Sequence, residues 1–365
     1  MSDRDYDVVF VGAGLSALLL LAELRPRLPG RVAVIDPVPP SERGLVHWSY
    51  WSHERTPYDR FAIGTWRLAE VAGVSPKSIA PYTMRLVRST DVLAHLGALL
   101  EDVPLDRLRT TARSISRRTD KLYEISTDAG AVRASWVFDS ATEVSPSFPS
   151  SLRPRALLGG TGLVVEADRA VFDTKTATLF DPLDERSFAY LLPLGPSAAL
   201  LESASFGPVV ADEDRAPLLH YLGARYPEAH FAVTHEEMGT IPLGFAPSPT
   251  CGPWHILIGA KRGLVKPSAG YGVVRIARES KHLARLWRED LELPASRPIS
   301  WQWRLLDTAF LRLAMRDPRR PMALLQRTMH AIPLAQTLRF IDEDLPPRWL
   351  ASLLSSTLPV VLRRP

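Results

Sequence analysis

Hydrophobic residues near the start of the chain form two short runs on either side of a glycine-rich turn. Residues 7–11 are almost all β-branched or aromatic, residues 12–17 read Gly-Ala-Gly-Leu-Ser-Ala, and helix-forming residues continue to Leu28. This pattern predicts a buried strand, a tight turn and a helix. A second hydrophobic run over residues 31–35 predicts another buried strand, which completes a strand-helix-strand unit.

The turn has the spacing of a dinucleotide-binding fingerprint. Gly12 permits the turn, Gly14 lets the backbone approach a pyrophosphate, and the small Ala17 allows close packing of helix on strand. Asp36 ends the second strand, 22 positions after Gly14, and an acid there accepts hydrogen bonds from ribose hydroxyls. The pyrophosphate is expected at the helix N-terminus. An ordinary glycine turn is the alternative interpretation.

Later segments extend the predicted nucleotide-binding unit. Strands are expected over residues 82–87, 122–127 and 131–138, with an amphipathic helix over 91–100. The last of these strands ends at Asp139. In proteins built on this plan an acid at that position lies in a segment that contacts the cofactor, so Asp139 is a candidate cofactor-binding residue, with a simple turn residue as the alternative.

Prolines and glycines punctuate the chain from about residue 147. Short strands are expected over residues 162–166, 176–180, 187–192 and 198–202 and suggest a separate antiparallel sheet. Further strands are expected over residues 231–236 and 256–259. A helix is expected over 212–226, and residues 239–244 look rich in turns.

A glycine-rich loop follows the strand at residues 256–259. It contains Gly263, Pro267 and Gly270 and opens a helix predicted over 273–289. Such a loop presents backbone N–H groups to an anion or to the edge of a cofactor ring. The cations beside it, Lys261, Arg262 and Lys266, are candidates for contact with pyrophosphate or anionic lipid, or are ordinary solvated loop charges.

These patterns predict an α/β protein in three parts. Residues 1–60, 90–146 and 250–290 form a Rossmann-like cofactor-binding domain, and residues 61–89 and 147–249 form an antiparallel-sheet substrate domain. Helical periodicity dominates the remaining residues, 291–365, which are expected to form a C-terminal helical region.

Composition narrows the class of protein. The chain has 365 residues, of which 46% are hydrophobic and 23% charged, as in folded globular proteins. A net charge of +4 does not suggest nucleic-acid binding. The lone Cys251 supplies neither a disulfide nor a set of thiolate ligands, so no metal site is predicted. With an acidic start and no apolar run of about 20 residues, the expected location is the cytoplasm.

Several motifs, in order, resemble the flavin-dependent lycopene cyclases of bacteria and plants, in particular the bacterial β-cyclase type. Besides the glycine turn they are Trp48-Ser49-Tyr50-Trp51, Trp66-Arg67, Leu179-Phe180-Asp181, Tyr190-Leu191-Leu192-Pro193-Leu194, Leu200-Leu201-Glu202, Glu237-Met238-Gly239-Thr240-Ile241-Pro242 and the loop from Gly263 to Tyr271. The resemblance implies FAD as cofactor, active in its reduced form, with NAD(P)H as reductant. It also implies a long hydrophobic isoprenoid substrate.

Two motifs depart from the family pattern. Two adjacent acids and a threonine are usual in the family where this chain has Glu202-Ser203-Ala204, so only the first acid remains. Asp-x-Arg-Gly is usual where this chain has Asp139-Ser140-Ala141-Thr142. The second departure bears on how tightly the flavin is held.

The implied reaction assigns roles to particular side chains. Ring closure protonates a terminal alkene, the neighbouring double bond attacks the cation, and a proton then leaves, with no net redox change. The resemblance identifies Glu202 as the acid and Glu237 as a proton relay or orienting group; an apolar site would keep Glu202 protonated. Trp48, Tyr50 and Trp51 are candidates for cation–π stabilisation or for simple core packing.

Other residues and regions keep two interpretations. Asp181 has either a catalytic role or a role in holding strands together, and His47 is interpreted as a packed side chain rather than a covalent flavin attachment point. Basic residues are mixed with apolar ones after Asp317, so the C-terminal helices either contact a membrane peripherally or only cap the domain.

The sequence leaves three alternative functions open: a cyclase of another prenylated or terpenoid substrate, a flavin monooxygenase or isoprenoid reductase, and a non-catalytic carotenoid-binding homologue.

Overall fold

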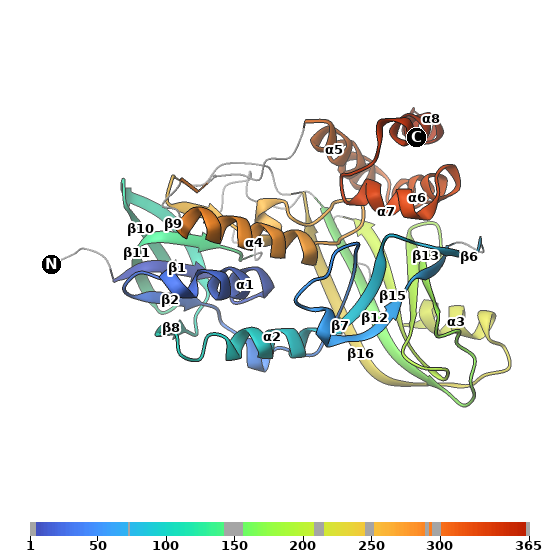
Figure 1. Ribbon diagram of the computed structural model, residues 1–365, viewed down its shortest axis with the longest axis horizontal. Coiled ribbons are helices and arrows are strands. Elements are labelled where there is room, and N and C mark those ends of the chain that lie inside the picture. Colours follow the sequence, from blue (N-terminus) through green and yellow to red (C-terminus); the bar gives the residue numbers. More distant parts are fainter. Residues whose placement is uncertain are drawn as a thin grey trace.

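The computed structural model describes residues 5–71, 74–141, 156–207, 215–244, 252–288, 292–293 and 301–362. Within these residues three β-sheets lie along the long axis of the molecule, and helices cover them (Figure 1). The first sheet and its helices occupy the end that carries the N-terminus, while the second sheet and the C-terminal helices occupy the other end. The predicted α/β fold is confirmed.

The first sheet has the parallel core of a Rossmann-like domain. Its order is β8 (Leu105–Leu108), β2 (Val32–Ile35), β1 (Tyr6–Val11), β11 (Gly130–Asp139), β10 (Leu122–Thr127) and β9 (Ala112–Thr119), with β17 (His255–Leu257) on β11. Strands β8, β2, β1, β11 and β17 run parallel, and β10 and β9 are antiparallel. All these strands come from the segments expected to bind the cofactor.

Continuous hydrophobic runs explain why these strands lie at the centre. Residues Val8 to Val11 of β1 are buried, and so is the whole of β2. Strands that are covered on both faces require such runs rather than an alternating pattern. Helices α1 (Leu15–Leu24) and α4 (Val273–Arg288) pack on one face, while α2 (Ser89–Ala98) packs beside α1.

The second sheet forms most of the other domain. Its order is β16 (Phe231–Leu243), β12 (Ala156–Ala167), β15 (Ala198–Gly207), β14 (Ser187–Pro193), β13 (Thr176–Pro182), β5 (Leu68–Val71) and β6 (Val74–Ser78). All neighbouring strands are antiparallel except β13 and β5. Helix α3 (Ala216–Arg225) buries Leu218 and Leu222 against one face.

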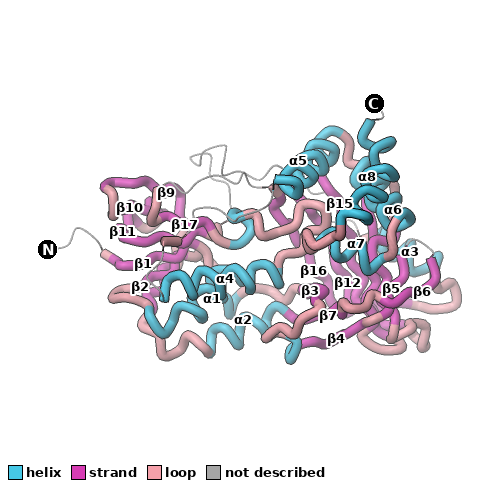
Figure 2. The backbone as a smooth tube through the Cα atoms, turned by 45° about the horizontal axis from the view of Figure 1, so that its top comes forward, coloured by secondary structure: helices cyan, strands magenta, loops and turns pink. Residues whose placement is uncertain are grey.

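A small third sheet joins the two domains. It consists of β3 (His47–Ser52), β7 (Thr83–Arg88) and β4 (Ala62–Trp66), all antiparallel. Four helices follow at the C-terminal end of the described chain, and the tube view shows them stacked over the second sheet (Figure 2). They are α5 (Trp301–Arg316), α6 (Arg319–Ala331), α7 (Leu334–Ile341) and α8 (Pro347–Leu362).

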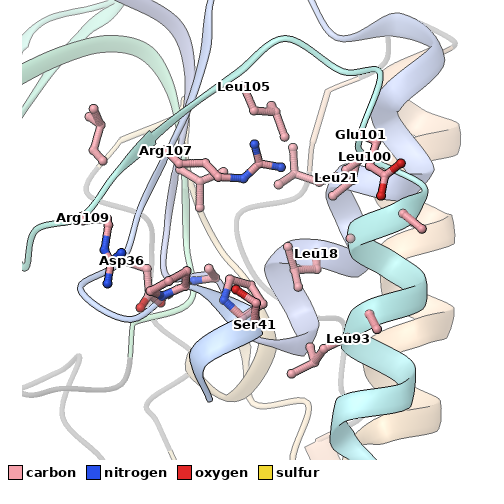
Figure 3. Close-up of a pocket in the computed structure, with 18 of the residues that line it drawn as sticks. Leu18, Leu21, Asp36, Ser41, Leu93, Leu100, Glu101, Leu105, Arg107 and Arg109 are labelled. Atoms are coloured by element: carbon pink, nitrogen blue, oxygen red, sulfur yellow. Dashed lines mark hydrogen bonds between the residues drawn. The ribbon is translucent and has the colours of Figure 1, made fainter.

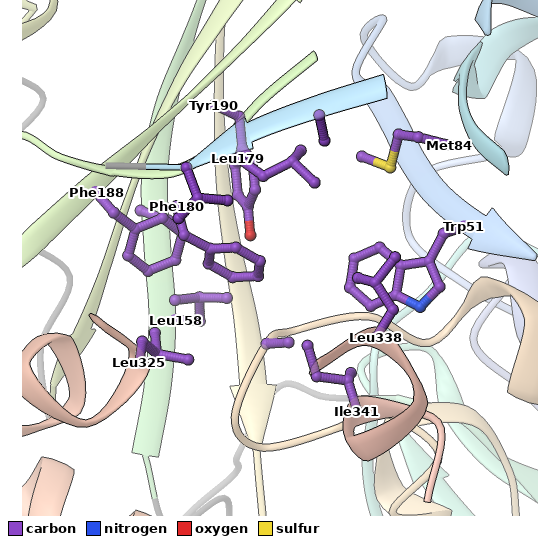
Figure 4. Packing of buried hydrophobic residues seen from close by; sticks show 14 of the residues in the cluster. Trp51, Met84, Leu158, Leu179, Phe180, Phe188, Tyr190, Leu325, Leu338 and Ile341 are labelled. Atoms are coloured by element: carbon purple, nitrogen blue, oxygen red, sulfur yellow. The ribbon is translucent and has the colours of Figure 1, made fainter. Parts of the chain in front are cut away.

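The C-terminal helices share a hydrophobic core with the second sheet. Leu325 of α6 and Leu338 and Ile341 of α7 pack in the same cluster as Phe180 and Tyr190 of the sheet (Figure 4). Phe310 of α5 makes an edge contact with Phe206, with ring centroids 5.1 Å apart. Because these side chains fill one continuous core, the helices are an integral part of the domain that contains the second sheet.

The structure corrects one expectation from the sequence, and part of another lies outside the described residues. Residues 239–244 look rich in turns, but the strand β16 continues through Leu243 and pairs with β12 along its length. Pro242 is tolerated because β16 is an edge strand, where one side needs no ladder hydrogen bonds. Residues 212–214 of the helix expected at 212–226 lie outside the described residues, and α3 begins at Ala216.

Candidate functional site

The glycine turn leads from β1 into α1 and leaves open space at the helix N-terminus. Gly12 has a φ of +94°, and a Cβ there would lie 2.4 Å from Ser140 Oγ, so the turn requires glycine. A Cβ on Gly14, by contrast, would meet no atom within 4 Å. The first turn of α1 contains no acidic residue. Backbone N–H groups at this end therefore face a space that suits an anion.

Asp36 holds the turn from the end of β2. Its Oδ2 atom accepts a hydrogen bond from the Ala13 N–H at 2.6 Å and another from the Arg43 guanidinium at 2.6 Å. Its Oδ1 atom accepts one from the Val38 N–H at 2.9 Å. Ala17 is fully buried against the sheet, as its place in the fingerprint predicts.

A cavity of about 500 Å³ opens beside Asp36 (Figure 3). Its walls are mainly apolar, from Leu18 of α1, Leu93 of α2 and Leu105 of β8. Arg107 and Asp36 bring polar groups into it from β8 and β2. An apolar slot beside an acid and a helix N-terminus has the chemistry required for the adenosine half of a dinucleotide, so these residues fit that group.

Asp139 does not face this cavity. Its carboxylate is fully buried, and both oxygens accept hydrogen bonds from Lys261 Nζ at 2.8 Å. His255 Nε2 lies 3.3 Å from Oδ2. Burial alone would raise the pKa of Asp139, but the Lys261 ammonium and the His255 hydrogen bond lower it below its ordinary value.

The three loop cations are buried, which corrects the view of them as solvated charges or contacts for lipid head groups. Lys261 pairs with Asp139, and Arg262 pairs with Glu279 of α4 at 2.6 Å. Lys266 is fully buried and lies 2.6 Å from Asp307 Oδ1 of α5. Each cation therefore neutralises a carboxylate inside the protein.

The loop that carries Lys266 folds tightly onto the second sheet. Gly263 ends the short helix η5 (Gly259–Arg262) with a φ of +72°, and Pro267 is buried. Gly270 also has a φ of +72°, and a Cβ there would lie 2.3 Å from Leu158 of β12. These residues bring the loop against β12 and make it one wall of a second cavity.

The second cavity lies between the cofactor-binding domain and the second sheet, and has a volume of about 500 Å³. The cofactor-binding domain contributes Leu15 at the start of α1 and Ile276 of α4, together with residues 269–273. Strand β3 contributes His47, Trp48 and Ser49, and the second sheet contributes β12, β14, β15 and β16. The N-terminus of α1 and the interior of the substrate domain thus open onto one space.

Both predicted acids project into this cavity from one row of the sheet. Glu202 of β15 and Glu237 of β16 each pair with the same residue of β12, Gly162. Tyr190 of β14 pairs with Glu202 and continues the row. Directly paired residues point to the same face, so Gly162 separates the two carboxylates without placing a side chain between them.

Glu202 lines the cavity, and its carboxyl group has an elevated pKa. Burial raises the pKa of Glu202 to about 8, and the charge of Glu237 adds to the effect. A group with this pKa is mostly protonated at neutral pH and can act as a general acid.

Glu237 is held by a different set of neighbours. Its carboxylate accepts hydrogen bonds from the His47 main-chain N–H at 3.0 and 3.1 Å, and the His47 ring Nδ1 lies 2.7 Å from Oε2. His235 Nε2 lies 3.5 Å from the same oxygen. His47 is a buried side chain, as predicted, and it also fixes the position of an acid.

Aromatic rings form much of the remaining wall. Trp48 and Tyr190 line the cavity, and Trp51 packs against the cavity residue Tyr271 with ring centroids 3.8 Å apart. The hydroxyl groups of Tyr190 and Tyr271 are buried, and they interact with each other. Tyr50 instead donates a hydrogen bond to Asp59 at 3.0 Å, away from the cavity.

Asp181 has a structural position. Its carboxylate accepts a hydrogen bond from the Tyr221 hydroxyl at 2.6 Å, and Arg225 lies 3.5 Å away. Both partners belong to α3, so Asp181 ties β13 to that helix.

Sequence reasoning missed Gly162, His235 and the placement of Tyr190 beside Glu202. Tyr190 was visible only as part of a motif, and His235 lies two positions before Glu237, where alternation along a strand places both side chains on one face. That spacing was the available signal for His235. Nothing in the sequence marks Gly162, whose role depends on strand register.

Residues 7–362 match the family described as "Lycopene cyclase protein". No curated protein matches the chain.

Similar solved structures share the overall fold. A geranylgeranyl bacteriochlorophyll reductase-like protein from Thermoplasma acidophilum is 13% identical, with a TM-score of 0.58 over 98% of this chain and 97% of its own. The p-nitrophenol 4-monooxygenase PnpA from Pseudomonas putida DLL-E4 is 17% identical, with a TM-score of 0.56 over 99% and 98%. The halogenase PltM, in complex with phloroglucinol and FAD, is 12% identical, with a TM-score of 0.55 over 98% and 91%.

Proposed function

We propose that this chain, which belongs to the lycopene cyclase family, closes rings at the acyclic ends of lycopene or a similar carotene by a redox-neutral reaction. One observation carries the proposal: an apolar cavity holds the Glu202 carboxyl group, whose pKa is raised to about 8. A protonated carboxyl in apolar surroundings is the group required to protonate an alkene.

The cavity residues supply the steps of ring closure. The Glu202 carboxyl donates its proton to the terminal alkene, the neighbouring double bond attacks the resulting cation to form the ring bond, and a ring carbon then loses a proton. The rings of Trp48 and Tyr190 offer π-faces to the cation, worth roughly 0.5–2 kcal/mol each. The proton gained and the proton lost balance, so the product is an isomer of the substrate.

FAD is the proposed cofactor, and the residues of the first domain fit it. The open N-terminus of α1 suits the pyrophosphate, and the slot beside Asp36 suits the adenosine. The halogenase PltM, a protein of similar fold, has a crystal structure in complex with phloroglucinol and FAD. When bound in its reduced form, with NAD(P)H as reductant, the flavin would supply negative charge to stabilise the cation.

Asp139 is proposed to act on the flavin indirectly. Its carboxylate belongs to the buried group with Lys261 and His255, while the next residue, Ser140, packs against Gly12 of the turn. Asp139 would therefore set the position of the cofactor turn through the end of β11.

Expression of the full chain in a host that accumulates lycopene tests the proposal. The wild type is expected to convert lycopene into cyclic carotenes, while Glu202→Gln keeps its bound flavin and forms no cyclic product. Glu236→Gln is the matched control, because Glu236 is a partly exposed neighbour of Glu237 on β16. Retention of most activity by Glu202→Gln would overturn the assignment.

A reductase is the second candidate function, because the geranylgeranyl bacteriochlorophyll reductase-like protein has a similar fold. The two functions differ in their use of reductant. A cyclase uses NAD(P)H only to reduce the flavin once, whereas a reductase consumes one equivalent for each double bond reduced. Measuring NAD(P)H consumed per product molecule separates them.

Peripheral membrane contact through the C-terminal helices is also proposed. Trp301 and Leu305 lie one turn apart on α5 and are 69% and 62% exposed. The exposed residues Arg304 and Arg312 on the same helix provide positive charge for anionic lipids. Among the described helices, none is long and apolar enough to span a membrane.

A further inference from the structure

The carboxylate of Glu237 lies between two imidazole rings that reach it from different strands. His47 on β3 approaches to 2.7 Å through Nδ1, and its main-chain N–H also donates to the carboxylate. His235, on the same strand as Glu237, approaches to 3.5 Å through Nε2. The two contacts of His47 fix the carboxylate, and the contact of His235 is longer.

These three side chains lead from the cavity to the surface. The exposed fractions of the side chains are 3% for His47, 7% for Glu237 and 33% for His235. Glu237 and His47 line the cavity, but His235 is not among the lining residues. His235 therefore contacts solvent outside the cavity, while its ring nitrogen faces the carboxylate that borders the cavity.

We infer that Glu237 accepts the proton released on ring closure and that His235 exchanges this proton with solvent, an inference that rests on the proposed cyclisation. The step moves one proton from a ring carbon to Glu237 as the ring double bond forms, then to His235 Nε2 and to water. No electrons are gained or lost. Imidazole suits the last transfer because it changes protonation near neutral pH.

The shape of the site explains why such a path is required. Once an isoprenoid chain fills the cavity, it excludes water from Glu202 and Glu237. Gly162 places no side chain between the two acids, so a proton on Glu237 can also return to Glu202. Solvent exchange through His235 competes with this internal return, and the balance between them can be measured.

A metal site is the competing interpretation of the same cluster. The ligand atoms of His47, His235 and Glu237 lie within 4.8 Å of one another. His235 Nε2, however, also lies 3.3 Å from the Leu45 carbonyl oxygen, so a hydrogen on that nitrogen has an acceptor. Once Nε2 has received the proton from Glu237, that hydrogen can bond to the Leu45 carbonyl oxygen, so proton transfer also accounts for this contact, and adding EDTA and then Zn²⁺ separates the two interpretations.

Deuterium labelling tests the path. Purified full-length holoenzyme with reduced FAD is given lycopene in vesicles prepared in D2O, and the deuterium in each new ring is measured by mass spectrometry. The wild type is expected to insert close to one deuterium per ring, because its acid exchanges with solvent between turnovers. His235→Ala is expected to insert less than half as much and to turn over about 100-fold more slowly, the range for loss of a proton-transfer group.

Chemical rescue separates proton transfer from a structural role. Added imidazole should restore both labelling and rate in His235→Ala, because the vacated site is open to solvent. His230→Ala is the control, because His230 precedes β16 and its side chain is 91% exposed. It should behave as the wild type does, with or without imidazole.

Three results would overturn the inference. Labelling and rate in His235→Ala that match the wild type, or that imidazole does not change, would show that His235 carries no proton. Loss of wild-type activity with EDTA and its return with Zn²⁺ would identify a metal site instead. A wild type that forms no rings at all, while still binding FAD, would overturn the proposed function and this inference with it.

Discussion

Asp139, which is fully buried, and Glu202, which lines the second cavity, have pKa values shifted in opposite directions because their neighbours differ. Asp139 has the Lys261 ammonium against both oxygens, and that charge lowers its pKa. Glu202 has no cation in the same position, so burial and the charge of Glu237 raise its pKa to about 8. Burial therefore produces an acid only where no positive charge is paired with the carboxyl group.

The pH dependence of ring formation follows from this pKa. Glu202 must be protonated to act, so single-turnover activity is expected to be high below pH 8 and to fall as the pH rises through about 8. The measurement uses enzyme with its flavin already reduced, so that the pH dependence of reduction does not contribute. A rate that increases between pH 7 and 9 would contradict the role of Glu202 as acid.

Gly162→Ala tests the spacing of the two acids. A Cβ on Gly162 would lie 2.7 Å from Glu237 Cγ, and His47 restricts how far Glu237 can move. We expect a correctly folded variant whose ring-forming rate is about 100-fold lower, because displacing a reacting group by roughly 1 Å has that effect. Gly195→Ala is the control, since a Cβ there meets nothing within 4 Å. Equal rates for the two variants would refute the argument.

At the scale of elements, strand register decides which chemistry the sheet can do. Helix α3 lies between Glu202 and Glu237 in the sequence, yet both residues pair with Gly162. A shift of one residue in either pairing would turn one acid to the opposite face of the sheet. The continuous pairing of β16 with β12 through Leu243 therefore fixes the register that places Glu237 opposite Gly162.

The loop from Lys266 to Tyr271 depends on the C-terminal helices. Lys266 Nζ lies 2.6 Å from Asp307 of α5 and 3.4 Å from Glu343, just after α7. Lys266→Met removes the positive charge that lies beside these two mostly buried acids. The substitution is therefore expected to lower the free energy of unfolding by about 3–5 kcal/mol. Chemical denaturation measures the change.

Arg319→Met provides the comparison for Lys266→Met. Arg319 pairs with Asp317 at 3.0 Å, but its side chain is 56% exposed. The loss of an exposed pair is expected to change the free energy of unfolding by less than about 1 kcal/mol. If both variants lost the same stability, the buried pair would not hold the loop.

At the scale of the whole molecule, the second cavity lies where two domains meet. The helix N-terminus that suits a pyrophosphate and the acids of the second sheet belong to different domains, and the cavity connects them. The exposed end of α5 belongs to the group of C-terminal helices, α5 to α8, and this group packs on the second sheet (Figure 1). If α5 contacts a bilayer as proposed, a substrate taken from that bilayer would enter the domain that contains the second cavity.

Flotation with anionic liposomes tests the membrane contact. Replacing both Trp301 and Leu305 by alanine removes apolar surface worth roughly 1.5–3 kcal/mol for each side chain that inserts, so binding should weaken at least tenfold. Leu68→Ala is the control, because Leu68 is a 37% exposed residue outside the helical layer. If the double variant floats as well as the wild type, α5 is not the contact.

The sequence alone determined the elements whose signals are local. Continuous apolar runs predicted β1 and β2, and the glycine spacing predicted the turn before α1 with Asp36 beside it. These features depend on neighbouring residues in the chain, so composition and spacing contain enough information to find them. Glu202, which lines the cavity, was a candidate only because its motif resembles that of the family, since composition and spacing alone would make it a solvated residue at the end of a strand.

Only the tertiary structure decided which distant residues meet. The burial of Lys261 and Lys266, the placement of Gly162 between two acids and the contact of His235 with Glu237 all depend on packing or strand register. A charged residue looks the same in a sequence whether it faces water or a buried carboxylate. Its partner is fixed when the sheets and helices pack, because Coulomb and hydrogen-bond energies depend on distance in space rather than on distance along the chain.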